Sequence, residues 1–341
     1  MRNRLTLAAL AAFAIAADAR GAAAEDLTLY CSPQIEWCDL MVEAFTRETG
    51  ITVAMTRKSS GETFAQIKAE ASNPRGDVWW GGTGDPHLAA AEEGLTEEYR
   101  SPMLAELHPW AQKQAEQSGY RTVGIYAGAL GFGYNAEMLA QAGADAPACW
   151  ADLLNPAFKG EISVANPNSS GTSYTMLATM VQLMGEDAAF DYLKALHPNI
   201  AQYTKSGSAP IKDAARGEVT VGIVFQHDAV TQRVEGFPIV TVAPCEGTGY
   251  EIGSMSIVKG APNLENAKKF YDFALRADIQ SRAAEAKAYQ VPSNMGATAP
   301  EEAPDFSTIK LIDYDFATFG SSETRARLLA RWDSEIGALA N

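Results

Sequence analysis

Short apolar segments alternate with segments of helical periodicity along the first third of the chain. The strand-like segments are residues 27–30, 51–55 and 77–80, and the helical segments are residues 35–46, 63–71 and 87–93. Strands that alternate with helices favour a mainly parallel sheet with helices packed on its faces. The pattern therefore predicts an α/β fold.

Two strand-like segments at residues 122–126 and 130–134, separated by Ala-Gly-Ala, come where a first unit of this kind should end. We place a hinge crossing there, and we expect residues 250–258 to cross back. The further strands expected are residues 162–165, 201–204, 219–225 and 239–242, and the further helices are residues 149–158, 174–183, 209–215, 263–275, 278–288 and 322–340.

The length of the chain also favours two lobes, because 341 residues exceed what one compact core usually holds. With the crossings placed at the hinge strands, lobe 1 comprises residues 25–126 and 252–300. Lobe 2 then comprises residues 127–251 and 301–341. Each lobe is expected to hold a mainly parallel sheet flanked by helices.

The N-terminus has the pattern of a secretory signal peptide, residues 1–24, cleaved near Ala24. It carries Arg2 and Arg4, a mostly apolar run over residues 5–17 and small residues at 22–24. The apolar run is too short to span a bilayer, so we expect export to the periplasm without membrane insertion. The leader holds three Arg and one Asp, so its removal takes the formal charge from −15 to −17. Such a charge argues against nucleic acid as a partner.

Four cysteines lie in a chain that is expected to be exported, where disulfides form. Four cysteines allow three pairings. We favour Cys31 with Cys38, which ties a first strand to its helix, and Cys149 with Cys245, which fastens two distant segments. A zinc site is the competing interpretation, but it needs CxxC pairs or clustered histidines. The chain has four His and neither pattern, so no metal is expected.

The tripeptide Ser-Ser-Gly occurs twice, at residues 59–61 and 169–171, each time between a strand-like and a helical segment. A helix start offers unpaired N–H groups and the positive end of the helix dipole, which suit an anion. Taken singly, each turn is more simply a helix cap, because Ser before a helix is common for that reason alone. Open α/β sheets bind ligands beyond the carboxyl ends of their strands. Other polar or small residues fall at this edge, namely Ser32, Gly82, Ser206 and His227.

Motifs of two hydrolytic mechanisms are missing from the chain, since it has neither GxSxG nor a P-loop. His227 and Asp228 follow a buried strand, and adjacent strand residues point to opposite faces. We therefore interpret them as binding ligand hydroxyls rather than as a catalytic dyad. Glu251, which follows Gly-Thr-Gly-Tyr, is a further candidate for this role. Neither enzyme activity nor a cofactor is expected.

Four segments carry a resemblance to a known family. They are YCSPQIEWC, DVWWGGTGDP, GEISVANPNSSGTSYTMLATM and YEIGSMSIVKGA. Together they resemble the periplasmic ferric-binding-like family of ABC importer substrate-binding proteins, and within it the branch that takes up hexose phosphates. The resemblance covers nearly the whole mature chain. It implies a two-lobed type II binding protein, a monomer, whose hinge closes on a solute and which delivers that solute to an inner-membrane ABC permease and its ATPase.

Ferric members of the family hold iron through two neighbouring Tyr, a His and a Glu, and this sequence departs at each position. The residues at or near those positions are Gln226, His227 and Asp228 for the tyrosines, Ser32 or Pro33 for the histidine, and Gly81 or Gly82 for the glutamate. An Fe(III) site without its phenolates is not expected. The second-lobe turn that holds an anion in iron carriers is kept, so the resemblance implies anion binding without the metal.

The resemblance and the residues together predict a receptor for a small phosphorylated solute, with a sugar phosphate as the first candidate. The residues expected to hold the phosphate are Ser169, Ser170, Gly171, Thr172, Ser206 and Gly207. Those expected to close from the opposite lobe are Ser32, Ser59, Gly82 and Thr83, and those expected to bind sugar hydroxyls are His227, Asp228 and Glu251. The alternatives are 2-aminoethylphosphonate or another phosphate ester, ferric iron, and, from another class, an exported phosphatase.

Overall fold

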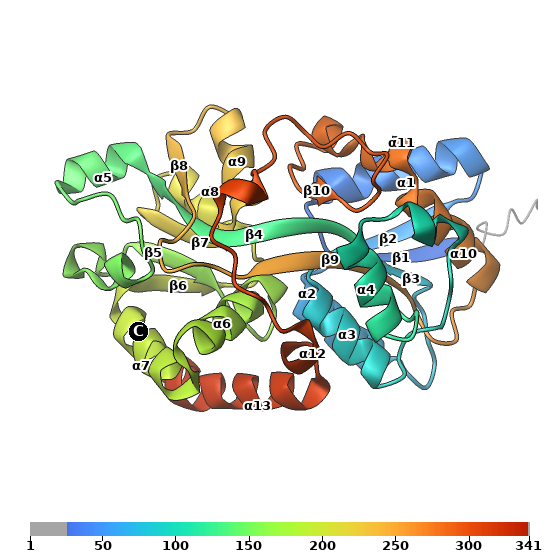
Figure 1. Cartoon of the computed structure of the whole chain (residues 1–341), viewed down its shortest axis with the longest axis horizontal. Coiled ribbons are helices and arrows are strands. Elements are labelled where there is room, and N and C mark those ends of the chain that lie inside the picture. The colour runs from blue at the N-terminus through green and yellow to red at the C-terminus, as the bar shows by residue number, and fades with distance from the viewer. Residues whose placement is uncertain (1–25, 340–341) are drawn as a thin grey trace, which may run out of the picture.

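The computed structural model describes residues 26–339 of the chain. The predicted signal peptide lies outside the described residues. The chain forms two α/β lobes side by side, and one sheet runs through both of them with helices on either side (Figure 1). The predicted α/β fold class is confirmed.

The elements follow one another in the alternating order that the sequence predicts. The strands are β1 (Leu27–Cys31), β2 (Val53–Arg57), β3 (Val78–Trp80), β4 (Val123–Asn135), β5 (Ile162–Ala165), β6 (Ile200–Thr204), β7 (Val221–Phe225), β8 (Ile239–Val242), β9 (Tyr250–Ile257) and β10 (Val291–Pro292). The α-helices are α1 (Ile35–Thr49), α2 (Ser60–Ala69), α3 (Gly84–Glu92), α4 (Pro109–Gln117), α5 (Ala136–Ala142), α6 (Gly171–Met184), α7 (Glu186–Leu196), α8 (Ala209–Ala215), α9 (Gln226–Val234), α10 (Leu264–Leu275), α11 (Ala277–Gln280), α12 (Phe316–Phe319) and α13 (Ser322–Trp332). The short turns are η1 (Pro102–Glu106), η2 (Ala151–Leu154), η3 (Pro156–Phe158), η4 (His197–Asn199), η5 (Ala283–Ala286), η6 (Phe306–Thr308) and the π-helical η7 (Asp333–Gly337).

Two parallel groups of strands are joined by two antiparallel strands. The strand order is β2-β1-β3-β9-β4-β7-β5-β6, and β8 and β10 also pair with β4. β1 runs parallel to β2 and β3, and β5 runs parallel to β6 and β7. β9 is antiparallel to β3 and to β4, and β4 is also antiparallel to β7. These two strands are therefore the connection between the lobes.

The hinge strand β4 is continuous over 13 residues, where the sequence predicted two strands separated by Ala-Gly-Ala. Its first half pairs with β9 and its second half with β7 and β8. The prediction of a break was wrong, because the small residues do not end the strand but let the His227 side chain approach its backbone closely. A Cβ on Gly128 would lie 2.6 Å from Nδ1 of His227, so only glycine leaves room for that side chain.

Three predicted helices are shorter or more irregular than the periodicity indicated. Residues 149–158 form the turns η2 and η3, because Pro156 disfavours helical backbone at the residue before it. Residues 278–288 form α11 and η5, and Lys287 ends this stretch with a left-handed φ of 53°. The last helix ends at Trp332 and continues only as the π-helical turn η7.

Each half of the sheet has its own hydrophobic core. One core includes Leu29, Phe45, Trp80, Met255 and Phe270. The other includes Phe132, Trp150, Met180, Phe190 and Trp332. The lobe boundaries drawn from the sequence stay a prediction, because β4 and β9 contribute to both halves.

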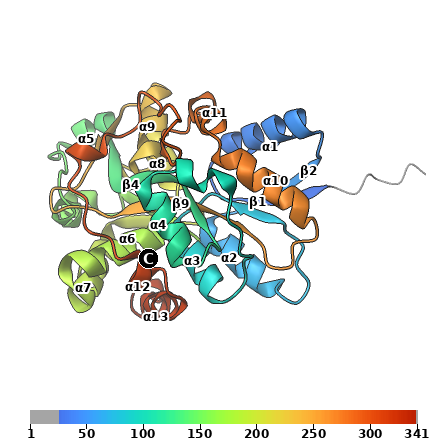
Figure 2. The ribbon, with the colours of Figure 1, turned by 45° about the vertical axis from the view of Figure 1, so that its right-hand side comes forward.

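The C-terminal segment joins the two lobes a second time. After β10 the chain crosses in front of the sheet, and α12 and α13 lie below α3 and α6 (Figures 1 and 2). The crossing segment contacts the start of the hinge, where Leu311 forms a β-bridge with Thr248. Within residues 26–339, we find no helix that combines the length and the apolar character needed to cross a membrane.

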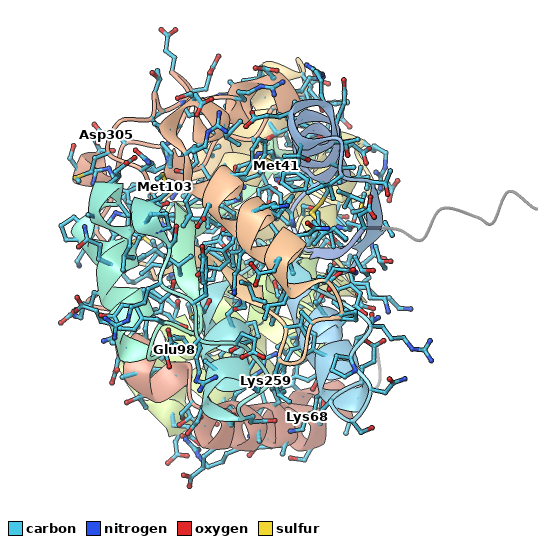
Figure 3. The ribbon with its side chains drawn as sticks, turned by 90° about the vertical axis from the view of Figure 1, so that its right-hand side faces the viewer. Met41, Lys68, Glu98, Met103, Lys259 and Asp305 are labelled. Carbon is cyan, nitrogen blue, oxygen red and sulfur yellow. A yellow bond between two sulfur atoms is a disulfide. The ribbon has the colours of Figure 1, made fainter. Side chains whose placement is uncertain are left out.

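The outer face of the half that contains β1 is charged. Figure 3 shows Lys68 and Lys259 on this face, and they pair with Glu93 and Glu97, each at 2.8 Å. Both lysine side chains are more than half exposed, and ion pairs of this kind contribute little stability.

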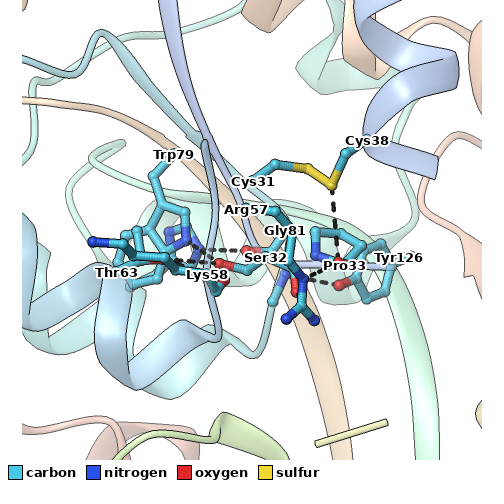
Figure 4. Close-up of a disulfide and its surroundings, with 12 residues drawn as sticks. Cys31, Ser32, Pro33, Cys38, Arg57, Lys58, Thr63, Trp79, Gly81 and Tyr126 are labelled. Carbon is cyan, nitrogen blue, oxygen red and sulfur yellow. Dashed lines mark hydrogen bonds between the residues drawn. A yellow bond between two sulfur atoms is a disulfide. The ribbon is translucent and has the colours of Figure 1, made fainter. Parts of the chain in front are cut away.

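Both predicted disulfides are present. Cys31–Cys38 joins the end of β1 to α1 (Figure 4), and Cys149–Cys245 joins residues 96 positions apart.

Replacing Cys149 and Cys245 by serine should lower the free energy of unfolding by roughly 4 to 5 kcal/mol, against roughly 2 to 3 kcal/mol for the other pair. The reason is that opening the longer loop returns more conformational entropy to the unfolded chain. Urea unfolding of the two double variants measures this difference, and equal losses would contradict it.

Candidate functional site

A cavity lies between the lobes, at the carboxyl ends of the parallel strands. The helices α1, α2, α3, α6, α8 and α9 all begin here, and their N-cap residues line the cavity. These N-caps are Gln34, Ser59, Thr83, Ser170, Ser208 and Phe225. The first turn of each helix has N–H groups without an intrahelical acceptor, and the positive ends of the dipoles meet at the cavity. The cavity therefore suits an anion.

The second Ser-Ser-Gly turn and the neighbouring glycine loop form one wall of the cavity. The predicted second-lobe residues in this wall are Ser170, Gly171, Thr172 and Gly207. Ser169 and Ser206, also predicted, do not line the cavity. Ser169 Oγ donates a hydrogen bond to the Lys205 carbonyl (2.9 Å), and Ser206 Oγ accepts one from Arg57 (3.3 Å). These two serines shape the wall from behind.

The opposite wall contains the four first-lobe residues named from the sequence, which are Ser32, Ser59, Gly82 and Thr83. The Gly82 N–H donates to the Tyr126 hydroxyl (2.8 Å), so this amide is already satisfied within the protein. The Ser59 N–H donates to the Glu62 carboxylate (3.3 Å) as part of a capping box. The first Ser-Ser-Gly turn therefore both caps α2 and lines the cavity.

The two Ser-Ser-Gly turns meet across the cavity. The Gly61 N–H donates to the Ser169 carbonyl (3.0 Å), which joins the start of α2 to the turn before α6. A second bond between the walls runs from Gln34 Nε2 to the carboxylate of Asp228. The lobes are thus in contact around the cavity, as in a binding cleft that has closed.

Replacing Gly61 by alanine should weaken ligand binding without destabilising the fold. A Cβ at this position would overlap the Asn168 carbonyl oxygen and lie 2.9 Å from that of Ser169, both on the opposite wall. Alanine favours the helix by roughly 0.5–1 kcal/mol over glycine, whereas crowding across the cleft costs about 1–3 kcal/mol only when the cleft is closed.

The expected result is an affinity for a sugar phosphate that is at least about fivefold lower. The midpoint of thermal unfolding of the free protein should be unchanged or higher. Calorimetric titration and thermal unfolding measure the two quantities. The exposed Ala65→Ser on the same helix is the control. An unchanged affinity for Gly61→Ala would show that this contact plays no part in closure.

The three candidates for hydroxyl binding form a buried cluster on the cavity. Nε2 of His227 lies 3.8 Å from Asp228 Oδ2 and 3.9 Å from Glu251 Oε1, and each of the three residues is at most 6% exposed. The sequence placed His227 and Asp228 on opposite faces of a strand. That placement was wrong, because β7 ends at Phe225 and both residues lie in the first turn of α9, where both reach the cavity.

Burial sets the protonation of this cluster. It lowers the pKa of His227, against the attraction of Asp228, so the imidazole is neutral near pH 7. Burial, reinforced by the negative charge of Asp228, raises the pKa of Glu251 well above its usual range. Glu251 therefore keeps its proton and offers a hydrogen-bond donor as well as an acceptor.

Arg57 also lines the cavity, and the sequence reasoning did not predict it. It is the one Arg or Lys among the described residues that line the cavity. Its Nε donates to the Pro33 carbonyl (2.9 Å) and one Nη to the Ser32 carbonyl (3.4 Å), which holds the side chain beside the loop after β1 (Figure 4). Burial lowers the pKa of Arg57, but a guanidinium stays ionised in proteins. Its place at the end of β2, two residues before Ser59, was the available signal.

Several polar atoms of the lining residues have no hydrogen-bond partner within residues 26–339. They are Gln34 Oε1, Thr83 Oγ1, His227 Nδ1 and Gln290 Oε1. Buried polar atoms are normally paired. A ligand with several hydroxyl groups would offer donors and acceptors to such a set.

A solved structure of the periplasmic binding protein AfuA from Actinobacillus pleuropneumoniae, with exogenous fructose-6-phosphate bound, shares 48% sequence identity and a TM-score of 0.90, and the match covers 92% of this chain and 99% of that one. An uncharacterized protein of Haemophilus influenzae is 44% identical over 98% of both chains. A putative 2-aminoethylphosphonate-binding periplasmic protein of Salmonella paratyphi A is 29% identical over 73% of this chain and 72% of its own.

A family model for bacterial extracellular solute-binding proteins matches residues 85–318. The match includes both hinge strands, the second Ser-Ser-Gly turn and the buried His227 cluster. The fold is that of the type II periplasmic binding proteins, as the likeness to AfuA shows. The chain therefore belongs to the bacterial extracellular solute-binding proteins, as a periplasmic solute-binding protein of an ABC importer.

Proposed function

We propose that this protein binds a hexose phosphate in the cleft between its lobes and delivers it to the permease of an ABC importer. The observation that carries the proposal is the meeting of six helix N-termini and Arg57 at one cavity that also holds the buried His227 cluster. The cavity is thus suited to an anionic group and to hydroxyls in the same ligand. The bound sugar phosphate of the 48% identical AfuA supports this assignment.

The phosphate is assigned to the wall made by Ser170, Gly171, Thr172 and Gly207. The amides at the start of α6 have no intrahelical acceptor, and a 14-residue helix directs its dipole at them. Arg57 reaches this wall from the other lobe, since its guanidinium lies 3.3 Å from Ser206 Oγ. A guanidinium and several N–H donors together favour a phosphate over its hydration shell.

The sugar hydroxyls are assigned to His227, Asp228 and Glu251. A hydroxyl both donates and accepts, and this cluster combines an acceptor carboxylate, a neutral imidazole and a protonated acid. A ligand that lacked these hydroxyls would leave the buried groups unpaired, at about 1–3 kcal/mol for each group. Selection among phosphorylated solutes therefore falls to this end of the cavity.

A phosphonate with an amino group is the second candidate, because Asp228 could equally hold an ammonium. The putative 2-aminoethylphosphonate-binding relative favours keeping this candidate. Ferric iron has less support. The single cluster with metal-ligand geometry in the described chain is Cys149, Cys245 and Glu246, and its two sulfurs form a disulfide. Burial also keeps the Tyr126 phenol protonated by raising its pKa, so no phenolate is supplied there.

A thermal-shift series tests the proposal. The ligands are glucose 6-phosphate, fructose 6-phosphate, glucose, 2-aminoethylphosphonate and ferric citrate. Binding to the folded state stabilises it by RT ln(1 + [L]/Kd), about 2.7 kcal/mol at 100 times Kd. We expect a rise in the unfolding midpoint with the two sugar phosphates and none with glucose. A rise with ferric citrate or the phosphonate alone would overturn the proposal, and release of free phosphate would favour a phosphatase.

A further inference from the structure

A buried polar junction lies behind the ligand cavity, outside the lining residues. Its centre is Asp85 in the first turn of α3, which is fully buried and two residues after Thr83. The Asp85 carboxylate accepts hydrogen bonds from Thr175 of α6 (3.4 Å) and from the Tyr314 hydroxyl (3.3 and 3.4 Å). Asp85 therefore links its own helix α3 to α6, on the other side of the cleft, and to the C-terminal segment.

The C-terminal helix α13 completes the junction with Arg325. This side chain is 3% exposed, and its guanidinium lies 4.3 Å from the Tyr174 ring and 6.0 Å from the Phe64 ring. Its Nη1 has no hydrogen-bond partner in the described part of the chain. Tyr174 belongs to α6 and Phe64 to α2, so Arg325 also contacts both sides of the cleft. A second contact fixes α13 to α3, because the Ser322 N–H donates to Glu92 (2.7 Å).

The junction is one helical turn from the residues assigned to the phosphate. Thr175 follows Gly171 by four residues on α6, and Asp85 follows Thr83 by two on α3. Gly171 and Thr83 are in close contact across the cavity, since a Cβ on Gly171 would overlap Thr83 Oγ1. Separating the lobes there would pull Thr175 away from Asp85 and admit water to the carboxylate. The Asp85–Thr175 bond therefore belongs to the closed arrangement.

We propose that Asp85, Thr175, Tyr314 and Arg325 form a latch that stabilises the closed lobes, so that they set ligand affinity without touching the ligand. The latch favours closure most when Asp85 is protonated, because a neutral acid avoids the desolvation that an enclosed carboxylate suffers. Its test with a sugar phosphate rests on the proposed function. The latch itself does not depend on which solute the cleft holds.

The charges around Asp85 agree with this direction. Burial raises its pKa to about 6, although Arg325 and the hydrogen bonds from Tyr314 and Thr175 oppose the shift. Tyr174 and Tyr314 stay neutral because burial raises their pKa values further, and Arg325 stays ionised. Glu251, whose own pKa Asp85 helps to raise, stays protonated near neutral pH.

The sign of the pH effect follows from these shifts. An exposed aspartate has a pKa of about 3.9, and the closed form raises it to about 6. Closure therefore takes up a proton between these values. The penalty on closure is fully present above about pH 6 and is lost as the pH falls towards 4.

Asp85→Asn tests the latch, because asparagine keeps the shape of the protonated acid without titrating. We measure the Kd of fructose 6-phosphate for wild type and variant from pH 5 to 7.5. The ratio of the two Kd values at each pH cancels the titration of the ligand itself. The wild-type Kd divided by the Asp85→Asn Kd should rise by roughly tenfold between pH 5 and pH 7.5. Asp85→Ala, which also removes the hydrogen bonds, should bind less tightly than Asp85→Asn at every pH.

Asp77→Asn is the matched control. Asp77 is equally buried, but its partners Thr28 and Asn263 lie on its own side of the cleft. This variant should be less stable and should keep the wild-type pH profile of Kd. A flat ratio for Asp85→Asn, with a loss of stability like that of Asp77→Asn, would overturn the latch and leave Asp85 a structural residue.

A ligand-free measurement separates the latch from the proposed function. The Gly61 amide bonds to Ser169 across the cleft, so its hydrogen exchange reports closure. Exchange in wild type relative to Asp85→Asn should quicken several-fold from pH 5 to 7.5. If fructose 6-phosphate binds neither protein, the proposed function fails, while this ratio still decides the latch. A ratio that does not change with pH would refute it.

Discussion

Replacing Arg57 with alanine should weaken the binding of fructose 6-phosphate by roughly 30- to 150-fold, the loss of about 2–3 kcal/mol that a hydrogen bond to a charged group supplies. The guanidinium is the one Arg or Lys charge on the described cavity wall, and it lies beside the turn assigned to the phosphate. Its loss removes both a charge and planar donors that match phosphate oxygens. Calorimetric titration measures the change.

Lys58→Ala is the matched control for this variant. Lys58 is the next residue in the chain and bonds to Gln66, but it does not line the cavity. We expect its Kd to stay within about twofold of wild type, since distant charges are screened. Arg57→Lys should recover only part of the affinity because lysine lacks the planar fork. Equal losses for Arg57→Ala and Lys58→Ala would show that Arg57 contributes only general charge.

Replacing Asp228 with alanine should weaken binding of the sugar phosphate by roughly 10- to 150-fold, while the affinity for inorganic phosphate changes far less. Asp228 lies in the hydroxyl cluster, with His227 at 3.8 Å, and not in the wall assigned to the phosphate. Removing it takes one acceptor away from the sugar hydroxyls in a buried site. Titration with both ligands at the same pH gives the two ratios.

Gln34→Ala controls for the contact that Asp228 makes across the cleft. Gln34 donates to the Asp228 carboxylate, so this variant removes the contact between the walls and keeps the acceptor. We expect it to weaken both ligands by a similar factor. If Asp228→Ala likewise affects inorganic phosphate and the sugar phosphate equally, Asp228 acts in closure and not in binding hydroxyls.

Local patterns carried most of the fold. The alternation of strand and helix depends on side chains within a few residues, so β1, β2, β5 and β7 were all anticipated. The continuity of β4 was not, because Gly128 meets a histidine 99 positions away in the chain. The irregular turns η2 and η3 were not predicted for a different reason, because their apolar spacing resembles that of a helix.

The site was predictable where it is built from strand ends and helix starts. Ser32, Thr83 and Ser170 follow strands and precede helices, and the topology of the sheet brings them to one edge. Arg57 was overlooked because a basic residue at a strand end is usually solvated, and only the meeting of the lobes gives it a partner in Ser206. The junction around Asp85 depends on Tyr314 and Arg325, which lie more than 200 residues further along the chain.

The division of the site between two walls has a consequence for release. Arg57 comes from β2, and the Ser170–Thr172 amides lie at the start of α6, so in the proposed binding mode each half of the molecule holds only part of the anion site. Separating the lobes therefore divides this site into two parts that each bind an anion weakly, although no residue has changed. Under the proposed function, a permease that separates the lobes lowers the affinity for the ligand and needs no competing binding site of its own to release it.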